Sequence, residues 1–475
     1  MTVSPSANPL APDGLRVPSD PNLLDPAIWP ASAHRQSGEL IVGGVSATEI
    51  AARFGTPVYV LDEADVQRRA TEVRDAFRGA LEAVGSSAKI YYAGKAFLSV
   101  AVVRWMDDLG LHLDVASGGE FAVALAAGFD PARVGYHGNN KSVAEIERAV
   151  AHRVGAIVLD SEIEIERVAA AARSAGVSQR VRLRVNSGVH ASTHEFLATS
   201  HEDQKFGVPL SEVPRLVARI REHQSLDFLG LHCHIGSQIF DTGGFSESAS
   251  RLIAVHRDLL AGGPVPELNL GGGFGIAYVD GDDPTPIDRI AEQIAQAVAG
   301  ECAAFGIPVP VVAVEPGRSI IGPAGLTLYE VGTIKDVRVD HDLGTAVRRY
   351  VSVDGGMSDN IRTALYGADY TVRIASRSSD AEPELVRLAG KHCESGDIVV
   401  SADYLPADVA PGDLVAVAAT GAYCWSLSSN YNYLGRPPVV SVRDGRARVL
   451  VRGETEADLL RRDAALDEPN DGEAS

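Results

Sequence analysis

Polar and glycine residues follow nearly every predicted strand in the first two thirds of the chain. Lys95 comes after an aromatic strand, and its amine can form a Schiff base with an aldehyde. The glycine run that ends at Gly273 lets backbone N–H groups approach an anion such as phosphate. Glu315 can hold a pyridine nitrogen protonated, and His234 can stack on such a ring. Together these residues indicate pyridoxal 5'-phosphate as the cofactor.

Each of these features also has a simpler interpretation. A lone lysine at a strand end is more often a solvated charge, and a glycine run can be only a tight turn. His232, Cys233 and His234 resemble a metal cluster. Successive side chains of a strand point to opposite faces, however, so Cys233 would point away from both histidines. With no further ligands at metal spacing we expect no metal site, and the shared position at strand ends favours the cofactor.

A regular alternation of strands and helices would place these residues at one edge. Eight β-rich runs lie at residues 89–92, 111–115, 133–136, 156–159, 181–185, 228–232, 267–270 and 311–314. Helix-like stretches separate them at residues 119–127, 142–152, 162–175, 213–223, 245–260 and 287–305. This pattern is typical of parallel βαβ units, and eight of them predict an α/β fold, the (β/α)8 TIM barrel. Function in such barrels gathers at the carboxyl ends of the strands.

After Glu315 the pattern changes to consecutive strands with few helices. They lie at residues 326–334, 349–353, 384–388, 398–402, 414–417, 439–442 and 447–451, which predicts a second, mostly antiparallel β domain. An early strand at residues 57–61 has no place in the barrel and is assigned to that domain. The predicted divisions are a Pro-rich arm (1–40), a strand and helix (41–88), the barrel (89–320), the β domain (321–455), and a helix with an acidic tail (456–475).

Composition excludes several classes of protein. The 475 residues are 45% hydrophobic and 22% charged, as in globular proteins, so a disordered or fibrous chain is excluded. A net charge of −20 argues against nucleic acid or an anionic membrane as partner. The four cysteines form no C-x-x-C pair and no signal peptide is evident, so we expect a cytoplasmic protein. Seven of the 25 prolines lie in residues 1–30, which predicts an extended arm outside the packed core.

Ten blocks of sequence, in order, resemble the diaminopimelate decarboxylases, which are fold-type III pyridoxal-phosphate enzymes, and the resemblance is greatest to actinobacterial members. The blocks are YYAGKAF from Tyr91, DVASGGE from Asp114, HGNNKS from His137, HEFLATSHEDQKFG from His194, GLHCHIGSQI from Gly230, LNLGGGFGIAY from Leu268, EPGRSI from Glu315, DGGMSDNIRTALYGA from Asp354, GKHCESGDI from Gly390 and GAYCWSLSSNYN from Gly421. The resemblance as a whole covers roughly residues 41–459, nearly the whole chain. Ile361 and Thr363 depart from the family, where prolines are usual, and Trp425 stands where another aromatic is common.

The resemblance implies a role for each matching residue. Lys95 would carry the cofactor and Cys393 would donate a proton, so these two are the expected catalytic residues. The cofactor would be bound by Lys95, Asp114, His234, Ser237, Gly273, Glu315, Pro316, Gly317, Arg318 and Tyr423. The substrate would be bound by Arg318, Arg362, Tyr366, Glu394 and Tyr423. In the family Cys393 and Glu394 come from the other subunit, so the resemblance implies a homodimer with shared active sites.

The implied reaction is decarboxylation of meso-diaminopimelate at its D-configured centre, giving L-lysine in the last step of lysine biosynthesis. The distal end of this substrate keeps a carboxylate, which suits arginine, and an ammonium group, which suits a carboxylate such as Glu394. A related decarboxylase acting on a D-amino acid or forming a diamine is the enzymatic alternative. A non-catalytic cofactor-binding homologue is the alternative from another class, although Lys95, Glu315 and Cys393 are all present.

Overall fold

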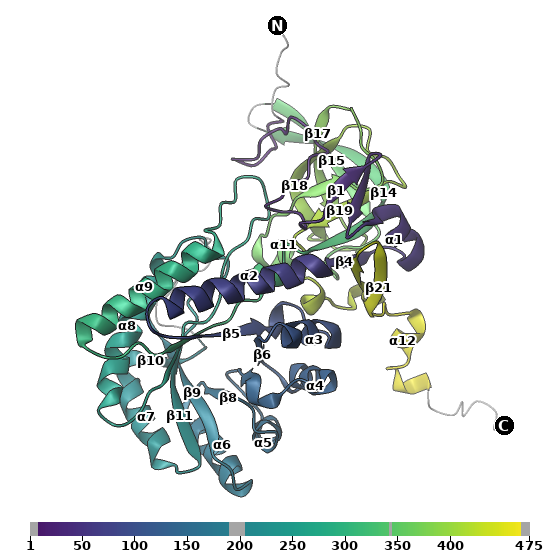
Figure 1. Ribbon diagram of the computed structural model, residues 1–475. Coiled ribbons are helices and arrows are strands. Elements are labelled where there is room, and N and C mark those ends of the chain that lie inside the picture. The colour runs from purple at the N-terminus through teal and green to yellow at the C-terminus, as the bar shows by residue number, and fades with distance from the viewer. Residues whose placement is uncertain (1–7, 190–204, 342–343, 467–475) are drawn as a thin grey trace, which may run out of the picture. The chain divides into compact units, whose positions relative to one another are not determined.

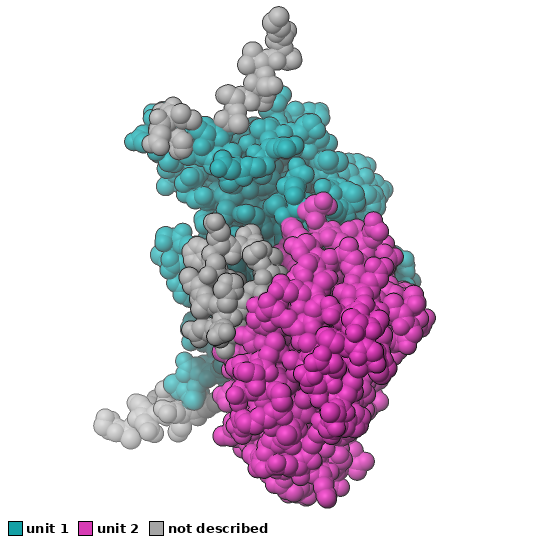
Figure 2. Space-filling model, turned by 90° about the vertical axis from the view of Figure 1, so that its left-hand side faces the viewer, with its two compact units in different colours: residues 1–66, 277–282, 321–475 teal, residues 67–276, 283–320 magenta. Residues whose placement is uncertain are grey.

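The computed structural model describes residues 8–189, 205–341 and 344–466. The chain divides into two compact units, which Figure 2 shows in different colours. The barrel unit comprises residues 67–276 and 283–320. The β unit comprises residues 1–66, 277–282 and 321–475.

The barrel unit contains a closed ring of eight parallel strands, which confirms the predicted fold (Figure 1). The ring runs β9 (Gln179–Asn186), β11 (Leu226–His232), β12 (Glu267–Asn269), β13 (Val311–Val314), β5 (Ala88–Ala93), β6 (His112–Val115), β7 (Val134–Tyr136) and β8 (Ala156–Leu159), and pairing of β8 with β9 closes it. A short extra strand, β10 (Val208–Pro209), pairs with β9. Each predicted strand is therefore present, with its ends moved by at most two residues.

Helices follow the strands as βαβ units require. They are α2 (Glu63–Glu82), α3 (Val100–Asp108), α4 (Gly118–Ala127), α5 (Val143–Ala151), α6 (Glu162–Ser174), α7 (Val213–Glu222), α8 (Gly243–Leu260), α9 (Ile287–Phe305) and the short α10 (Arg318–Ile321). Serine side chains cap the first turns of several, and Ser142 forms a capping box with Glu145 at the start of α5.

Charged side chains from strands that are not neighbours meet inside the barrel. Arg182 of β9 donates to Glu267 of β12 (Nη2–Oε2, 2.6 Å) and to the hydroxyl of Tyr91 on β5 (2.8 Å). Lys89 pairs with the same carboxylate. A buried charge is tolerated only with such partners, so this network fixes the relative positions of three strands.

The β unit is built on a mixed sheet in the order β18-β17-β15-β14-β4-β20-β21, with β19 pairing β14 and β16. Its strands are β4 (Val58–Asp62), β14 (Gly325–His341), β15 (Gly344–Val353), β16 (Val372–Ile374), β17 (Pro383–Ala389), β18 (Ile398–Pro406), β19 (Leu414–Ala418), β20 (Val439–Arg443) and β21 (Arg446–Val451). Most pairs are antiparallel, but β15–β17 and β4–β20 are parallel. The early strand β4 lies between β14 and β20 in this sheet.

Smaller elements complete the β unit. They are the three-stranded sheet β1 (His34–Gln36), β2 (Glu39–Val42) and β3 (Val45–Ser46), and the helices α1 (Ala47–Phe54), α11 (Arg362–Tyr366) and α12 (Glu456–Leu460). Among the helices of the described residues, none is both long enough and apolar enough to cross a membrane.

The expectation that residues 1–30 lie outside a packed core is wrong for Ile28 and Trp29. Both are buried, with 2% and 1% exposure, in a cluster with Val58, Leu328 and Val440. Prolines made the segment resemble an extended arm, but its two large apolar side chains gain more free energy from burial than an exposed arm would offer.

Replacing Trp29 by alanine should therefore destabilise the protein. The lost contacts and the remaining cavity should cost about 3–5 kcal/mol, seen as a lower urea midpoint of unfolding. Leu23→Ala is the matched control, because Leu23 lies in the same segment with 61% exposure. Equal midpoints for the two variants would contradict the packing of Trp29.

Candidate active site

The carboxyl ends of the barrel strands bring the predicted cofactor residues into one mouth. Lys95 lies in the short 3-10 helix Gly94–Ala96 directly after β5, with its side chain exposed. Gly94 lies so close to β6 that a Cβ there would be 2.8 Å from the carbonyl oxygen of Asp114. The lysine is thus held beside Asp114, and its charge lowers the pKa of that carboxyl against the larger effect of burial.

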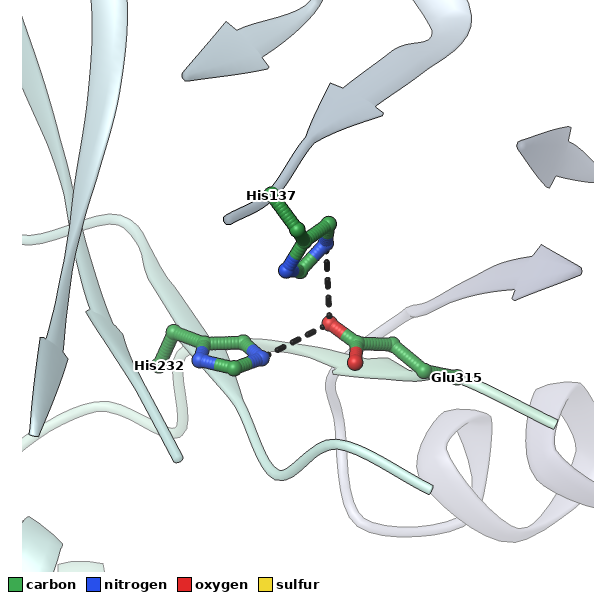
Figure 3. A group of neighbouring side chains, drawn as sticks. All are labelled: His137, His232 and Glu315. Atoms are coloured by element: carbon green, nitrogen blue, oxygen red, sulfur yellow. Dashed lines mark ion pairs between the residues drawn. The ribbon is translucent and has the colours of Figure 1, made fainter. Parts of the chain in front are cut away.

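Glu315, the residue after β13, is the centre of this mouth (Figure 3). Its Oε1 accepts a hydrogen bond from Asn269 Nδ2 (2.8 Å) and lies 2.9 Å from His232 Nε2. His137 Nε2 lies 3.5 Å from the same oxygen and 3.0 Å from Asp114 Oδ1. Four strand ends therefore meet at one carboxylate.

The two carboxyl groups of the mouth, Asp114 and Glu315, have pKa values shifted in opposite directions. Burial, together with the charge of Glu315, raises the pKa of Asp114 well above its usual range. Burial would also raise the pKa of Glu315, but His232 and His137 hold it well below its usual range. Burial lowers the pKa of each of these two histidines to about 4. These directions favour the charged form of Glu315 and the neutral form of Asp114.

The glycine run after β12 forms a close backbone turn next to Glu315. Gly271 and Gly273 have φ of +70° and +106°, and a Cβ on Gly272 or Gly273 would clash with the carbonyl oxygen of Glu315 or Gly236. The Gly272 N–H donates to His234 Nδ1 (3.3 Å), which leaves the proton of the imidazole on Nε2. Glycine is thus required here, because only a bare backbone fits so close to the mouth.

Asn269 links the glycine turn to the carboxylate. Its Oδ1 accepts from the Gly271 N–H (2.8 Å) while its Nδ2 donates to Glu315. Arg318, beyond Pro316 and Gly317, donates to Ser237 Oγ (2.8 Å) and is 8% exposed. An amine, an anion-binding turn, a cation and an ionised carboxylate fit a phosphate-bearing pyridine aldehyde, so the residues present suit pyridoxal phosphate.

His137, His232 and Glu315 also offer three ligand atoms within 4.8 Å of one another, a set that could hold a metal ion. Sequence spacing could not reveal this set, because His232 ends β11 while His137 and Glu315 directly follow β7 and β13. Cys233 is not part of it, since its Sγ lies 3.2 Å from Ser248 Oγ on α8. Both imidazoles face the same carboxylate, and the absence of a metal stays a prediction.

The remaining predicted residues lie in the β unit. Arg362, at the start of α11, donates to the Tyr370 hydroxyl, and its guanidinium lies 5.0 Å from the ring centroid of Tyr278. Cys393 and Glu394 lie exposed in the turn between β17 and β18. Tyr423 is half-buried with φ of +63°.

Two further residues of interest, Tyr366 and Thr363, lie within α11. Tyr366 at its end is 62% exposed. Thr363, where the family usually has proline, donates to the Val399 carbonyl (2.8 Å) and so ties the helix to β18. The hydroxyl supplies an anchor that proline could not.

Sequence reasoning gave no role to His137, His232 and Asn269. All three stood in or beside the quoted motifs at strand ends, which was the only available signal. Residues 194–204 of the fourth motif lie outside the described residues.

Comparison with known proteins identifies the family. Residues 64–322 match the family model described as "Pyridoxal-dependent decarboxylase, pyridoxal binding domain". The diaminopimelate decarboxylase of Mycobacterium tuberculosis is 52% identical over 446 residues, covering 92% of this chain and 98% of that protein. The chain belongs to the diaminopimelate decarboxylase family.

Two further relatives extend the comparison. The diaminopimelate decarboxylase of Bacillus subtilis is 43% identical over 437 residues, covering 91% of this chain and 97% of that protein. The crystal structure of the M. jannaschii diaminopimelate decarboxylase in co-complex with L-lysine has a TM-score of 0.83 at 29% identity, covering 91% and 97% of the two chains. Pyridoxal phosphate is the cofactor of this family.

Adding a methyl group to the glycine turn should disrupt cofactor binding. Gly272→Ala would drive its Cβ into the Glu315 backbone and displace the carboxylate, so we expect pyridoxal phosphate affinity to fall by about tenfold or more. Fluorescence titration of the apoprotein measures this. Gly300→Ala on α9 is the control, since nothing lies within 4 Å of a Cβ there. Unchanged affinity in Gly272→Ala would refute the close fit.

Proposed function

We propose that this protein decarboxylates meso-2,6-diaminopimelate to L-lysine and CO2 with pyridoxal phosphate, the last step of lysine biosynthesis. The observation that carries the proposal is the Glu315 carboxylate, which lies in the same barrel mouth as Lys95 and whose pKa His232 and His137 hold well below its usual range against the effect of burial. Relatives that match over more than 90% of the chain bear this enzyme's name. One structural neighbour was solved with L-lysine, the product of the proposed reaction.

The cofactor, when bound, supplies an electron sink for the pair left by CO2. Lys95 would hold its aldehyde carbon, and the Glu315 carboxylate would accept a hydrogen bond from its pyridine nitrogen. Ser237, Gly273, Pro316, Gly317 and Arg318 would also bind the cofactor, with His234 on the ring, and Asp114 and Tyr423 nearby. Asn269 holds Glu315 by a hydrogen bond, and His232 lies beside it, so the carboxylate would need little reorganisation when the cofactor binds.

Arginine and carboxylate side chains would select the distal end of the substrate. Arg318 and Arg362 suit its carboxylate, and Glu394 suits its ammonium group, with Tyr366 and Tyr423 as further contacts. Arg362 is held by Tyr370 and Tyr278, so its guanidinium loses little freedom on binding. A diamine-forming decarboxylase has no distal carboxylate to bind.

One proton enters for each CO2 that leaves. The bond between the α-carbon and the carboxylate breaks, and the electron pair stays with the α-carbon side. The Cys393 thiol would then give its proton to that carbon, which requires an accessible sulfur. Cys393 is the exposed one of the four cysteines, and the other three are buried.

We further propose a homodimer in which Cys393 and Glu394 complete the partner's site. Large side chains left exposed near the proposed substrate residues support an interface, among them Leu365, Tyr366 and Tyr433 at 55%, 62% and 71% exposure. A cytoplasmic location is proposed because the four cysteines, all among the described residues, form no disulfide.

CO2 release with a panel of amino acids tests the substrate. We expect cofactor-dependent release from meso-diaminopimelate to exceed that from the L,L isomer, ornithine or lysine by about 100-fold or more, because only the meso form fits both ends. L-lysine should appear in equal amount. Faster turnover of ornithine would show that the preferred substrate is not diaminopimelate. No turnover of any of these amino acids despite bound cofactor would favour a non-catalytic binding protein.

Mixing two inactive variants tests the shared site. Lys95→Ala and Cys393→Ala should each be inactive or severely slowed, but subunit exchange should restore about a quarter of wild-type activity, since half the dimers would hold one intact site. Each variant exchanged with itself is the control. Efficient exchange without any recovery would exclude the shared site.

A further inference from the structure

Three irregular segments of the β unit carry its proposed substrate-side residues. Residues 354–362 end at Arg362, residues 390–397 carry Cys393 and Glu394, and residues 421–433 carry Tyr423. Contacts from all three meet at one buried side chain, His392, which is 8% exposed. We propose that His392 is a positioning residue that clamps these segments together and thereby aims the Cys393–Glu394 pair. This inference rests on the proposed function.

Both ring nitrogens of His392 are engaged. Nε2 lies 2.8 Å from Ser358 Oγ, and Nδ1 lies 3.0 Å from Asn432 Oδ1. An amide oxygen can only accept, so Nδ1 carries the proton and donates it to Asn432, and Nε2 accepts from the Ser358 hydroxyl. One tautomer thus joins three segments.

The backbone beside His392 is held by a second anchor, Asp397. Its carboxylate accepts from the backbone N–H groups of His392 (2.7 Å) and Met357 (2.6 Å). Gly356 and Gly390 lie against this carboxylate so closely that a Cβ on either would clash with it. The glycines leave room for the carboxylate to bridge two of the segments.

Tyr431 carries the clamp to the proposed substrate-binding carboxylate. Its ring stacks on the His392 imidazole at a centroid distance of 5.3 Å and an interplanar angle of 22°. Its hydroxyl lies 3.5 Å from Glu394 Oε2, so it is placed to steady that side chain. Cys393 lies between His392 and Glu394 in the chain and is therefore fixed on both sides.

A clamp of this kind answers a physical need. Cys393 and Glu394 are exposed in a turn, where little packing restrains them. A displacement of about 1 Å can cost on the order of 100-fold in rate. A buried neighbour that joins three segments keeps the exposed pair in place without touching the substrate.

A double-mutant cycle on the holoenzyme tests the proposal. His392→Gln should lower kcat by about tenfold or more, because one amide cannot satisfy both partners at their separate positions. In a Cys393→Ala background the same change should lower kcat by a smaller factor, since the part of its effect that passes through the thiol is already lost. Lys391→Ala is the matched control, because this neighbouring side chain is exposed, and its kcat should stay at the wild-type value.

Hydrogen exchange supplies a readout that does not depend on activity. In His392→Gln the amides of residues 355–361 and 390–397 should exchange at least about tenfold faster, with the melting temperature little changed. Ser358→Ala, which removes one partner of the ring, should give the same pattern in milder form if His392→Gln folds poorly.

The outcomes separate the two proposals. Wild-type kcat in His392→Gln, or effects of His392→Gln and Cys393→Ala that multiply, would overturn the positioning role. Unchanged exchange in both segments would overturn the clamp itself. Faster exchange in a protein that does not decarboxylate diaminopimelate would keep the clamp and reject the proposed function.

Discussion

The barrel mouth depends on keeping one carboxylate ionised where water is scarce. Burial disfavours the charge of Glu315, so the fold must surround that group with hydrogen-bond donors. Asn269 donates a hydrogen bond and His232 Nε2 lies 2.9 Å from the same oxygen, while burial raises the pKa of Asp114 and disfavours a second negative charge. Asn269 also accepts a hydrogen bond from the glycine turn. The residues that surround the Glu315 charge therefore come from several strand ends and also shape the neighbouring turn.

The two units provide different parts of the chemistry that we propose. The barrel unit gathers the residues suited to the cofactor. Its buried network around Arg182 and Glu267 fixes the positions of the strands that carry those residues. The β unit carries Arg362 and the Cys393–Glu394 turn, each held by aromatic and imidazole side chains rather than by regular strands. In both units, functional groups rest on hydrogen-bonded neighbours that have no direct role in the reaction.

Much of the fold could be predicted from the sequence because its apolar strands and capped helices are strongly patterned. The strand β14 extends to His341, seven residues beyond the predicted end at Ile334, and this outer part alternates Val337 and Val339 with charged residues instead of forming a continuous apolar run. The strand β16 is too short to show a period. Trp29 was misassigned because prolines suggested an exposed arm. The roles of His137 and His232 needed three dimensions, since their shared partner Glu315 lies far away in sequence.

The protonation of the bound cofactor tests the central claim most directly. Pyridoxal phosphate with an isotope-labelled ring nitrogen can be bound to the wild-type protein and its nitrogen chemical shift measured by NMR at neutral pH. An ionised Glu315 predicts a protonated ring nitrogen, and Glu315→Gln, a neutral side chain of the same shape, should remove that proton. An unprotonated nitrogen in the wild-type protein, or the same shift in both, would contradict the account.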